Sequence, residues 1–207
     1  MFKNIIFDWS GVIRDTAEHH LWVVNKMFND VGVREISMQE LKENWEQPYM
    51  GFYNKYVPQW TLEQEQKAFR EVIARKDCPK AYPYKDTVEL VKKLKERGIP
   101  MVVLSGEDPT TIFPEIKQFG LEDVFKEVIA DTHDKAEKIH DLIKGNNFNP
   151  EETVFIGDTN HEIEVGKQAG VKTIAVTWGF CTEEKLKALN PDYLVHNIKE
   201  LEEVLLK

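Results

Sequence analysis

The sequence predicts an α/β fold: a Rossmann-like, mostly parallel sheet with helices on both faces, and an α-helical cap domain inserted near the N-terminus. Short apolar runs alternate with amphipathic helical patterns along most of the 207 residues, which is typical of parallel sheets with crossover helices. Between residues 16 and 80 this alternation stops, and only helical periodicity remains. We therefore expect a core of residues 1–15 and 81–207 and a cap of residues 16–80.

In the core, strands and helices are expected to follow one another. Six apolar runs have the length of strands: Asn4–Asp8, Pro100–Ser105, Glu127–Ala130, Thr153–Gly157, Lys172–Val176 and Tyr193–Val195. Helical patterns separate them and close the chain: Asp86–Arg97, Thr110–Phe119, Asp134–Lys144, Asn160–Ala169, Thr182–Ala188 and Ile198–Leu206. Alternation of this kind requires crossover connections, which cover both faces of a parallel sheet.

The inserted segment shows helical periodicity at four places: Thr16–Val31, Ser37–Gln47, Met50–Tyr56 and Leu62–Lys76. It leaves the core after the first strand and returns near Ala81. Four of the five tryptophans, Trp9, Trp22, Trp45 and Trp60, lie in the segment or just before it. We expect most of these rings to pack inside the segment and a minority to face a substrate.

The composition limits the classes of function. With 42% hydrophobic residues the chain can bury a sizeable core. Its formal net charge of −9 argues against non-specific binding to nucleic acid or to an anionic membrane surface. No apolar run approaches the roughly 20 residues of a membrane span, and no signal-peptide pattern opens the chain. A cytoplasmic protein is expected, and the sequence predicts no oligomeric state.

Polar residues follow the expected strands at their carboxyl ends, where open α/β sheets bind ligands. Taken singly, an aspartate or serine in such a place is often a helix cap, and a lysine there is usually a solvated helix residue. Their order along one edge of the sheet favours a common site. The residues concerned are Asp8, Ser10, Gly11, Ser105, Gly106, Lys135, Asp158 and Glu162.

Three runs and one lysine resemble the motifs of the haloacid dehalogenase-like hydrolases. Ile5–Val12 resembles the first motif of that superfamily, and Val103–Gly106 is similar to the second. Lys135 falls where the third-motif lysine is expected, and Val154–Glu162 resembles the fourth motif. The helical insertion is similar to the cap domain of the phosphoglycolate-phosphatase type. The resemblance covers the whole chain and implies a hydrolase, in the first place a phosphatase, that acts on a small phosphorylated metabolite.

The resemblance also implies a divalent cation as cofactor. Asp8 and Asp158 are hard oxygen ligands, which suit Mg²⁺. The backbone carbonyl of Ser10 is expected to complete the protein ligands, while Glu162 is expected to coordinate directly or to hold a metal-bound water. Asp8 is also the expected nucleophile, so the reaction would pass through an aspartyl-phosphate intermediate on this residue.

Other residues are expected to bind the transferring phosphoryl group. The Ser105 hydroxyl and the Lys135 ammonium would stabilise the charge on its oxygens. Main-chain N–H groups around Gly11 and Gly106 would add further donors. Lys138 competes for the lysine role, but Lys135 is favoured because helix N-termini point toward the expected site.

Ser10 departs from the phosphatase pattern, in which an aspartate at this position protonates the leaving group and then activates water. A serine hydroxyl is a poor acid–base group, so catalysis would be weakened. Hydrolases of phosphonoacetaldehyde also lack that aspartate and use a cap lysine as a Schiff base, a role for which Lys55 is the candidate here. A third alternative is a weakly active relative that binds a phosphometabolite.

Arg14 and four histidines complete the candidates. Arg14 lies at the entry to the insertion and is expected either to contact a substrate anion or to form a salt bridge between core and cap. His133 and His161 flank the expected site and could substitute as acid–base groups. His19 and His20 fall in the first cap helix, where packing or surface roles are favoured.

Overall fold

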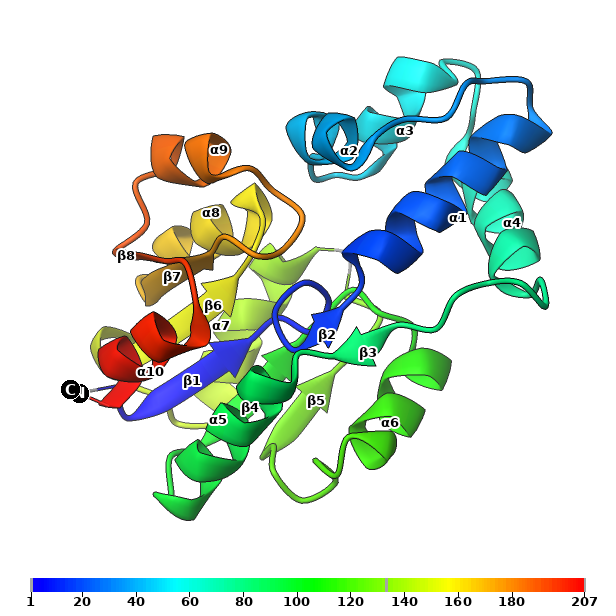
Figure 1. Cartoon of the computed structure of the whole chain (residues 1–207). Helices are drawn as coiled ribbons and strands as arrows, with labels where there is room; N and C mark the ends of the chain where they lie inside the picture. The colour runs from blue at the N-terminus through cyan, green and yellow to red at the C-terminus, as the bar shows by residue number, and fades with distance from the viewer. Residues whose placement is uncertain (1, 133, 207) are drawn as a thin grey trace.

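The computed structural model describes residues 2–132 and 134–206, so the acid–base candidate His133 lies outside the described residues. Six strands form one sheet in the order β5–β4–β1–β6–β7–β8, and all its pairings are parallel (Figure 1). The strands are β1 Asn4–Phe7, β4 Met101–Leu104, β5 Glu127–Ile129, β6 Thr153–Gly157, β7 Lys172–Val176 and β8 Tyr193–Val195. The predicted strands are therefore confirmed, with ends that differ by one residue at most.

Helices cover both faces of this sheet, as predicted. On one face Ile5 and Phe7 pack with helices α5 (Lys85–Glu96), α6 (Pro109–Gln118) and α10 (Ile198–Leu206). On the other face Ile6 packs with α7 (Lys135–Gly145) and α8 (Asn160–Gln168). Successive residues of β1 point to opposite faces, so this central strand is buried on both. A short 3₁₀ helix, η1 (Pro150–Glu152), precedes β6, and α9 (Glu183–Ala188) follows β7.

The inserted segment folds into four helices, which lie beside the carboxyl edge of the sheet (Figure 1). They are α1 Ala17–Asp30, α2 Met38–Asn44, α3 Met50–Tyr56 and α4 Leu62–Ile73. Their buried residues form one apolar cluster that includes Val24, Phe28 and Phe52 and continues into Phe180 and Leu186 of the α/β part. The helical segment therefore packs against the α/β part of the molecule through this shared apolar cluster.

A small antiparallel pair, absent from the predicted elements, connects the two parts. Strand β2 (Arg14–Asp15) pairs with β3 (Tyr82–Pro83), directly before α1 and after the return of the chain. Two-residue strands carry no periodicity, so no sequence pattern predicts them. Because the pair closes the base of the insertion, we propose that the cap domain comprises residues 16–80, as the periodicity suggests.

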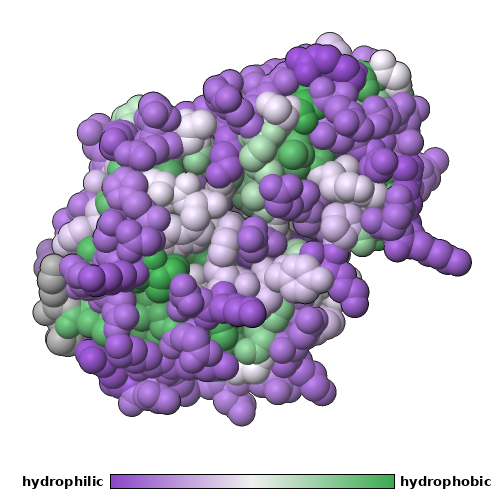
Figure 2. All heavy atoms as spheres, viewed as in Figure 1, coloured by the Kyte–Doolittle hydropathy of each residue, from purple (hydrophilic) through white to green (hydrophobic). Residues whose placement is uncertain are grey.

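The surface agrees with the polar composition of the chain. Figure 2 shows hydrophilic residues over most of the visible face, with hydrophobic residues in small patches between them. Among the described residues, no helix combines the length and the apolarity that crossing a membrane requires.

Candidate active site

Four charged residues from three strand ends meet at the carboxyl edge of the sheet. Asp8 follows β1, Asp158 follows β6, and Glu162 lies in the first turn of α8. These three offer carboxylate oxygens within 4.8 Å of one another, and all three are buried. The Lys135 ammonium, at the start of α7, donates to Asp8 Oδ1 at 2.8 Å and to Glu162 Oε1 at 2.6 Å. Residues far apart in the sequence thus form one ionic cluster.

Burial and ion pairing shift the pKa values of these four groups in opposite directions. Burial raises the pKa of Asp8 to about 6, although the Lys135 ammonium opposes the shift. Burial, with Asp8 and Glu162, also raises the pKa of Asp158 well above its usual range. For Glu162 the adjacent ammonium outweighs burial and lowers the pKa to about 2. In Lys135 the two carboxylates outweigh burial and raise the pKa.

Two loops enclose the Asp158 carboxylate. The backbone N–H of Phe180, after β7, donates to Asp158 Oδ2 at 2.6 Å. From the other side the loop after β1 approaches so closely that a Cβ on Gly11 would lie 2.1 Å from Asp158 Oδ2. Gly11 also has φ +78°, a backbone conformation that glycine adopts without strain. A Cβ on Gly179 would lie 2.0 Å from the same oxygen. A side chain at either position would therefore have to displace the Asp158 carboxylate or its own loop.

A divalent cation fits this donor set. Asp158 Oδ1 is buried and has no hydrogen-bond partner among the described residues, an arrangement that costs free energy unless another partner is bound. The cluster holds three carboxylates against one ammonium, so its charge is unbalanced. The oxygens are of the hard type that Mg²⁺ prefers. Both Glu162 oxygens already accept hydrogen bonds, Oε2 from the Thr159 N–H and hydroxyl and Oε1 from Lys135, which favours an indirect role for this residue.

A second network lies beside the cluster and starts from Ser10. The Ser10 hydroxyl donates to Glu107 Oε2 at 2.9 Å, and Arg14 donates to the same oxygen at 2.7 Å. Arg14 Nε lies 2.9 Å from Glu115 Oε1, and the Trp9 ring N–H donates to Glu115 Oε2. Arg14 therefore pairs with two carboxylates of the α/β part, and the alternative of a salt bridge between core and cap is wrong.

Comparison with known proteins identifies the family. The model of the haloacid dehalogenase-like hydrolases matches residues 5–176. The chain belongs to this family. A pyrophosphatase PpaX of Halalkalibacterium halodurans is 28% identical over 128 residues, which are 59% of this chain and 60% of that protein. A phosphoglycolate phosphatase of Synechococcus elongatus is 24% identical over 204 residues, 96% of this chain and 95% of that protein.

Solved structures agree with the hydrolase fold. The crystal structure of a predicted phosphatase from Clostridium acetobutylicum aligns with a TM-score of 0.83 and 21% identity. That alignment covers 100% of this chain and 99% of the other. At this level of identity the likeness concerns the fold, and it includes the helical insertion as well as the sheet.

The phosphoryl-binding candidates of this hydrolase lie at the same edge. Ser105, directly after β4, is buried, and its hydroxyl accepts the N–H of Glu107 at 3.1 Å. Gly106 follows it and is half-buried. Of the two candidate lysines, Lys135 is buried in the cluster whereas Lys138 is exposed on α7. The structure therefore brings Lys135, and not Lys138, to the carboxylates.

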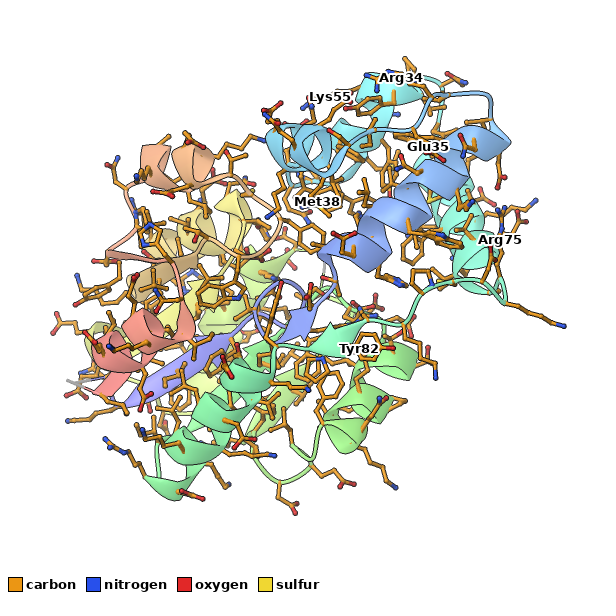
Figure 3. All side chains as sticks on the ribbon, in the orientation of Figure 1. Arg34, Glu35, Met38, Lys55, Arg75 and Tyr82 are labelled. Carbon is orange, nitrogen blue, oxygen red and sulfur yellow. The ribbon has the colours of Figure 1, made fainter. Side chains whose placement is uncertain are left out.

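Lys55 does not join the site. It lies on α3, on the outer side of the helical segment (Figure 3). Its ammonium is 3.0 Å from Glu46 Oε1 and donates to the carbonyl of Asn44, and the side chain is 43% exposed. The expectation that Lys55 binds substrate or forms a Schiff base thus finds no support in its position, because a lysine needs burial or a cationic neighbour for that chemistry.

The described histidines have different surroundings. His161 Nε2 accepts the backbone N–H of Lys135 at 3.4 Å, and burial lowers the pKa of this histidine. His20 packs edge-on against Trp45 and Phe180, and burial lowers its pKa to about 3. His19 contacts the carbonyl of Pro79. His20 therefore has a packing role and His19 a polar contact with the backbone, while His161 lies next to the ionic cluster.

Two residues of the site region are not predicted from the sequence. Glu107 follows Ser105 by two residues, and Phe180 lies in the loop after β7. Both follow the carboxyl ends of strands, so the rule that found Asp8 and Asp158 also applies to them. An acidic residue such as Glu107 is unexpected next to a phosphate site, and Phe180 makes its contact through the backbone, which no residue type reveals.

Proposed function

We propose that the chain is a magnesium-dependent phosphatase that hydrolyses a small phosphorylated metabolite through an aspartyl-phosphate intermediate on Asp8. One observation carries this proposal: three buried carboxylates, those of Asp8, Asp158 and Glu162, offer oxygens within 4.8 Å of one another, and the Lys135 ammonium pairs with two of them, Asp8 and Glu162. The names of the relatives suggest phosphoglycolate and pyrophosphate as the first substrates to examine.

Asp8 and Asp158 would hold the cation, together with the backbone carbonyl of Ser10. Bound Mg²⁺ neutralises a phosphate dianion and polarises its oxygens. Glu162 would position Lys135, since its Oε1 accepts from this ammonium at 2.6 Å. An ammonium has three donors, and two of those on Lys135 are used within the cluster, which leaves the third for an oxygen of the transferring group.

The reaction would proceed in two displacements on phosphorus. An Asp8 oxygen forms a bond to phosphorus while the bond to the leaving oxygen breaks. Water then attacks phosphorus, the bond to Asp8 breaks, and inorganic phosphate leaves. Ser105, Lys135 and the N–H groups near Gly11 and Gly106 would bind the phosphoryl oxygens in both steps. Arg14 would contribute less to binding a substrate anion than its position in the sequence suggests, because two carboxylates already pair with it.

Asp8→Asn tests the proposal directly. Wild-type protein with Mg²⁺ should release phosphate from phosphoglycolate, pyrophosphate or p-nitrophenyl phosphate, and excess chelator should abolish the release. The Asp8→Asn variant should lose at least about 10³-fold in kcat because an amide cannot act as the nucleophile. Intact-mass spectrometry of acid-quenched reactions should detect a phosphorylated species in wild type and none in the variant.

Asp141→Asn is the matched control, because Asp141 is an exposed aspartate on α7. This variant should keep wild-type turnover. Turnover by Asp8→Asn at the rate of the control would contradict the nucleophile, and turnover that survives the chelator would contradict the metal.

A further inference from the structure

We propose that Tyr84 is a positioning residue for Asp158: its hydroxyl holds the loop of residues 177–182, and this loop holds the Asp158 carboxylate. The inference rests on the proposed function, because Asp158 would serve the reaction through the cation that it binds. Tyr84 would act through the 177–182 loop, which connects β7 to α9, rather than by contact with the substrate.

The 177–182 loop encloses Asp158 from one side through three close approaches. The Phe180 N–H donates to Asp158 Oδ2 at 2.6 Å, and the Cys181 N–H donates to the Asp158 carbonyl at 3.3 Å. At Gly179 the main chain comes so near that a Cβ would lie 2.0 Å from Oδ2. A shift of this loop would therefore move or release the carboxylate.

The same contacts determine which Asp158 oxygen stays available. Oδ2 accepts from the loop, whereas Oδ1 is buried and has no hydrogen-bond partner among the described residues. A buried oxygen without a partner costs free energy, and a bound cation would supply the partner. The loop thus keeps one oxygen for the main chain and leaves the other to the cation.

Tyr84 contacts the loop one residue before Gly179. Its hydroxyl donates to the carbonyl of Trp178 at 3.3 Å, and its ring lies edge-on to the Trp178 ring, with 6.5 Å between the centroids. Trp178 in turn packs against the apolar cluster that α5, α6 and α10 form with the sheet. Burial, together with Asp15 and Asp158 nearby, raises the pKa of Tyr84, so the hydroxyl keeps its proton and remains a donor.

The main chain of Tyr84 is held independently of the loop. Tyr84 directly follows β3, where the inserted segment returns to the sheet, and it is the N-cap residue of α5. Its N–H donates to the carbonyl of Ile13 at 2.9 Å. Strand pairing on one side and a helix on the other fix this backbone, so the hydroxyl can restrain the loop rather than follow it.

Asp15 is the competing partner of the Tyr84 hydroxyl. It lies in β2, where it pairs with Tyr82 of β3, and its carboxylate interacts with the hydroxyl. A hydroxyl has one donor, so at any moment it serves either Asp15 or the Trp178 carbonyl. The two partners make different predictions for a variant in which the Asp15 carboxylate is removed.

Tyr84→Phe tests the inference, because it removes the hydroxyl and keeps the ring. Isothermal titration calorimetry should show that the Kd for Mg²⁺ rises by about three- to tenfold, which is the effect of losing one hydrogen bond. Tyr82→Phe is the matched control, since it makes the same change two positions earlier, at a residue that is 64% exposed. This control should bind Mg²⁺ with the wild-type Kd.

Nuclear magnetic resonance of the metal-free protein gives a readout that needs neither Mg²⁺ nor turnover. The Phe180 amide proton reports the length of its hydrogen bond to Asp158 Oδ2. In Tyr84→Phe this resonance should move upfield, because a loop that is held less firmly makes a longer hydrogen bond. The amide protons of β1 should stay at their wild-type positions, whereas a general loss of packing would move both.

An Asp15→Ala background tests the competing partner. If Tyr84 acts through Trp178, Tyr84→Phe should raise the Kd for Mg²⁺ in this background by the same factor as in the wild-type background. Four results would overturn the inference: an unchanged Kd in Tyr84→Phe, an equal rise in Tyr82→Phe, an unmoved Phe180 amide, or a rise that disappears when Asp15 is removed.

Asp158→Asn, titrated in parallel, distinguishes this inference from the proposed function. If this variant binds Mg²⁺ as the wild type does, the metal site of the proposed function fails. If it binds no Mg²⁺ while Tyr84→Phe binds with the wild-type Kd, the role of Tyr84 alone fails.

Discussion

Charge imbalance among a few buried side chains is the central feature at the scale of residues. Among the residues that the structure describes, Asp8, Asp158 and Glu162 are accompanied by one ammonium, that of Lys135, which pairs with Asp8 and Glu162. Burying unpaired charge is costly, so such a site takes up protons or a cation. Burial raises the pKa values of Asp8 and Asp158 for this reason. A bound cation would replace those protons, and its affinity should therefore increase with pH.

Asp158→Asn should remove the response of stability to magnesium. A cation that binds the folded state at 100 times its Kd stabilises a protein by about 2.7 kcal/mol, or about 5–10 °C in Tm at this size. Differential scanning fluorimetry should show this rise for wild type and for the surface control Asp141→Asn, and no rise for Asp158→Asn. A full response in the Asp158→Asn variant would remove Asp158 from the metal ligands.

Gly11→Ala should lower the free energy of unfolding more than the same substitution at Gly32. Gly32 has nearly the same φ, +79° against +78°, but a Cβ there would have nothing within 4 Å, whereas at Gly11 it would meet Asp158 Oδ2 at 2.1 Å. Gly32→Ala should cost about 1–2 kcal/mol from backbone strain alone. Gly11→Ala should cost about 1–3 kcal/mol more, as measured by urea unfolding. Equal losses in the two variants would mean that the loop can move away from Asp158.

At the scale of elements, the N-terminal caps of two helices also position candidate catalytic residues. Thr159 is the N-cap of α8, and its hydroxyl and N–H both donate to Glu162 Oε2. The capping box therefore fixes the carboxylate whose other oxygen holds Lys135. Lys135 itself opens α7 after the cap residue Asp134. Local capping interactions thus position Glu162 and Lys135, two of the four charged groups, at the carboxyl edge of the sheet.

Glu65 gives helix α4 a pH-dependent stability. Burial raises its pKa to about 7, while Arg70 and the nearby hydroxyls of Tyr49 and Tyr53 oppose the shift. Between the unfolded value near 4.5 and about 7, only the folded state keeps this proton, so stability falls as pH rises through this window and is then constant. Glu65→Gln removes the dependence. Its Tm relative to wild type should increase by a few degrees from pH 5 to pH 8.

The exposed Glu63→Gln, on the same helix, is the control for this change. Its Tm difference from wild type should stay constant over the same range of pH. A constant difference in Glu65→Gln as well would show that the Glu65 carboxyl titrates alike in the folded and unfolded states.

At the scale of the whole molecule, one loop connects the helical segment to the proposed metal ligand. The Phe180 N–H holds Asp158 Oδ2, while the Phe180 ring packs on Trp45 and His20 of the segment. Nearby, Lys185 on α9 donates to the carbonyl of Trp45 at 2.9 Å. The position of the cap and the geometry of the carboxylate therefore depend on the same loop.

Phe180→Ala should weaken both the fold and the site. Removing a phenylalanine that is 7% exposed should cost about 3–5 kcal/mol of unfolding free energy. The variant should also need more Mg²⁺ for half-maximal activity, since the loop that holds Asp158 loses its packing. Phe113, 50% exposed on α6, provides the control: Phe113→Ala should stay within about 0.5 kcal/mol of wild type. An unchanged magnesium requirement in the Phe180→Ala variant would uncouple the loop from the site.

The sequence by itself determined the α/β fold, the helical insertion and the strand ends where Asp8, Ser105 and Asp158 lie. Hydrophobic periodicity is a local property, and parallel strands place their carboxyl ends at one edge whatever the loops do. The choice of Lys135 over Lys138 also followed from position, because only the former opens its helix.

Only the tertiary structure decided which side chains meet across the loops. Three features depend on how loops approach in space. They are the pairing of Ser10 and Arg14 with Glu107, the hydrogen bond from the Phe180 N–H to Asp158, and the position of Lys55 away from the sheet edge. Such contacts join residues that are 22 to 97 positions apart, and no short-range pattern records them. Packing of the whole chain brings them together, whereas periodicity reports only which face of each element is buried.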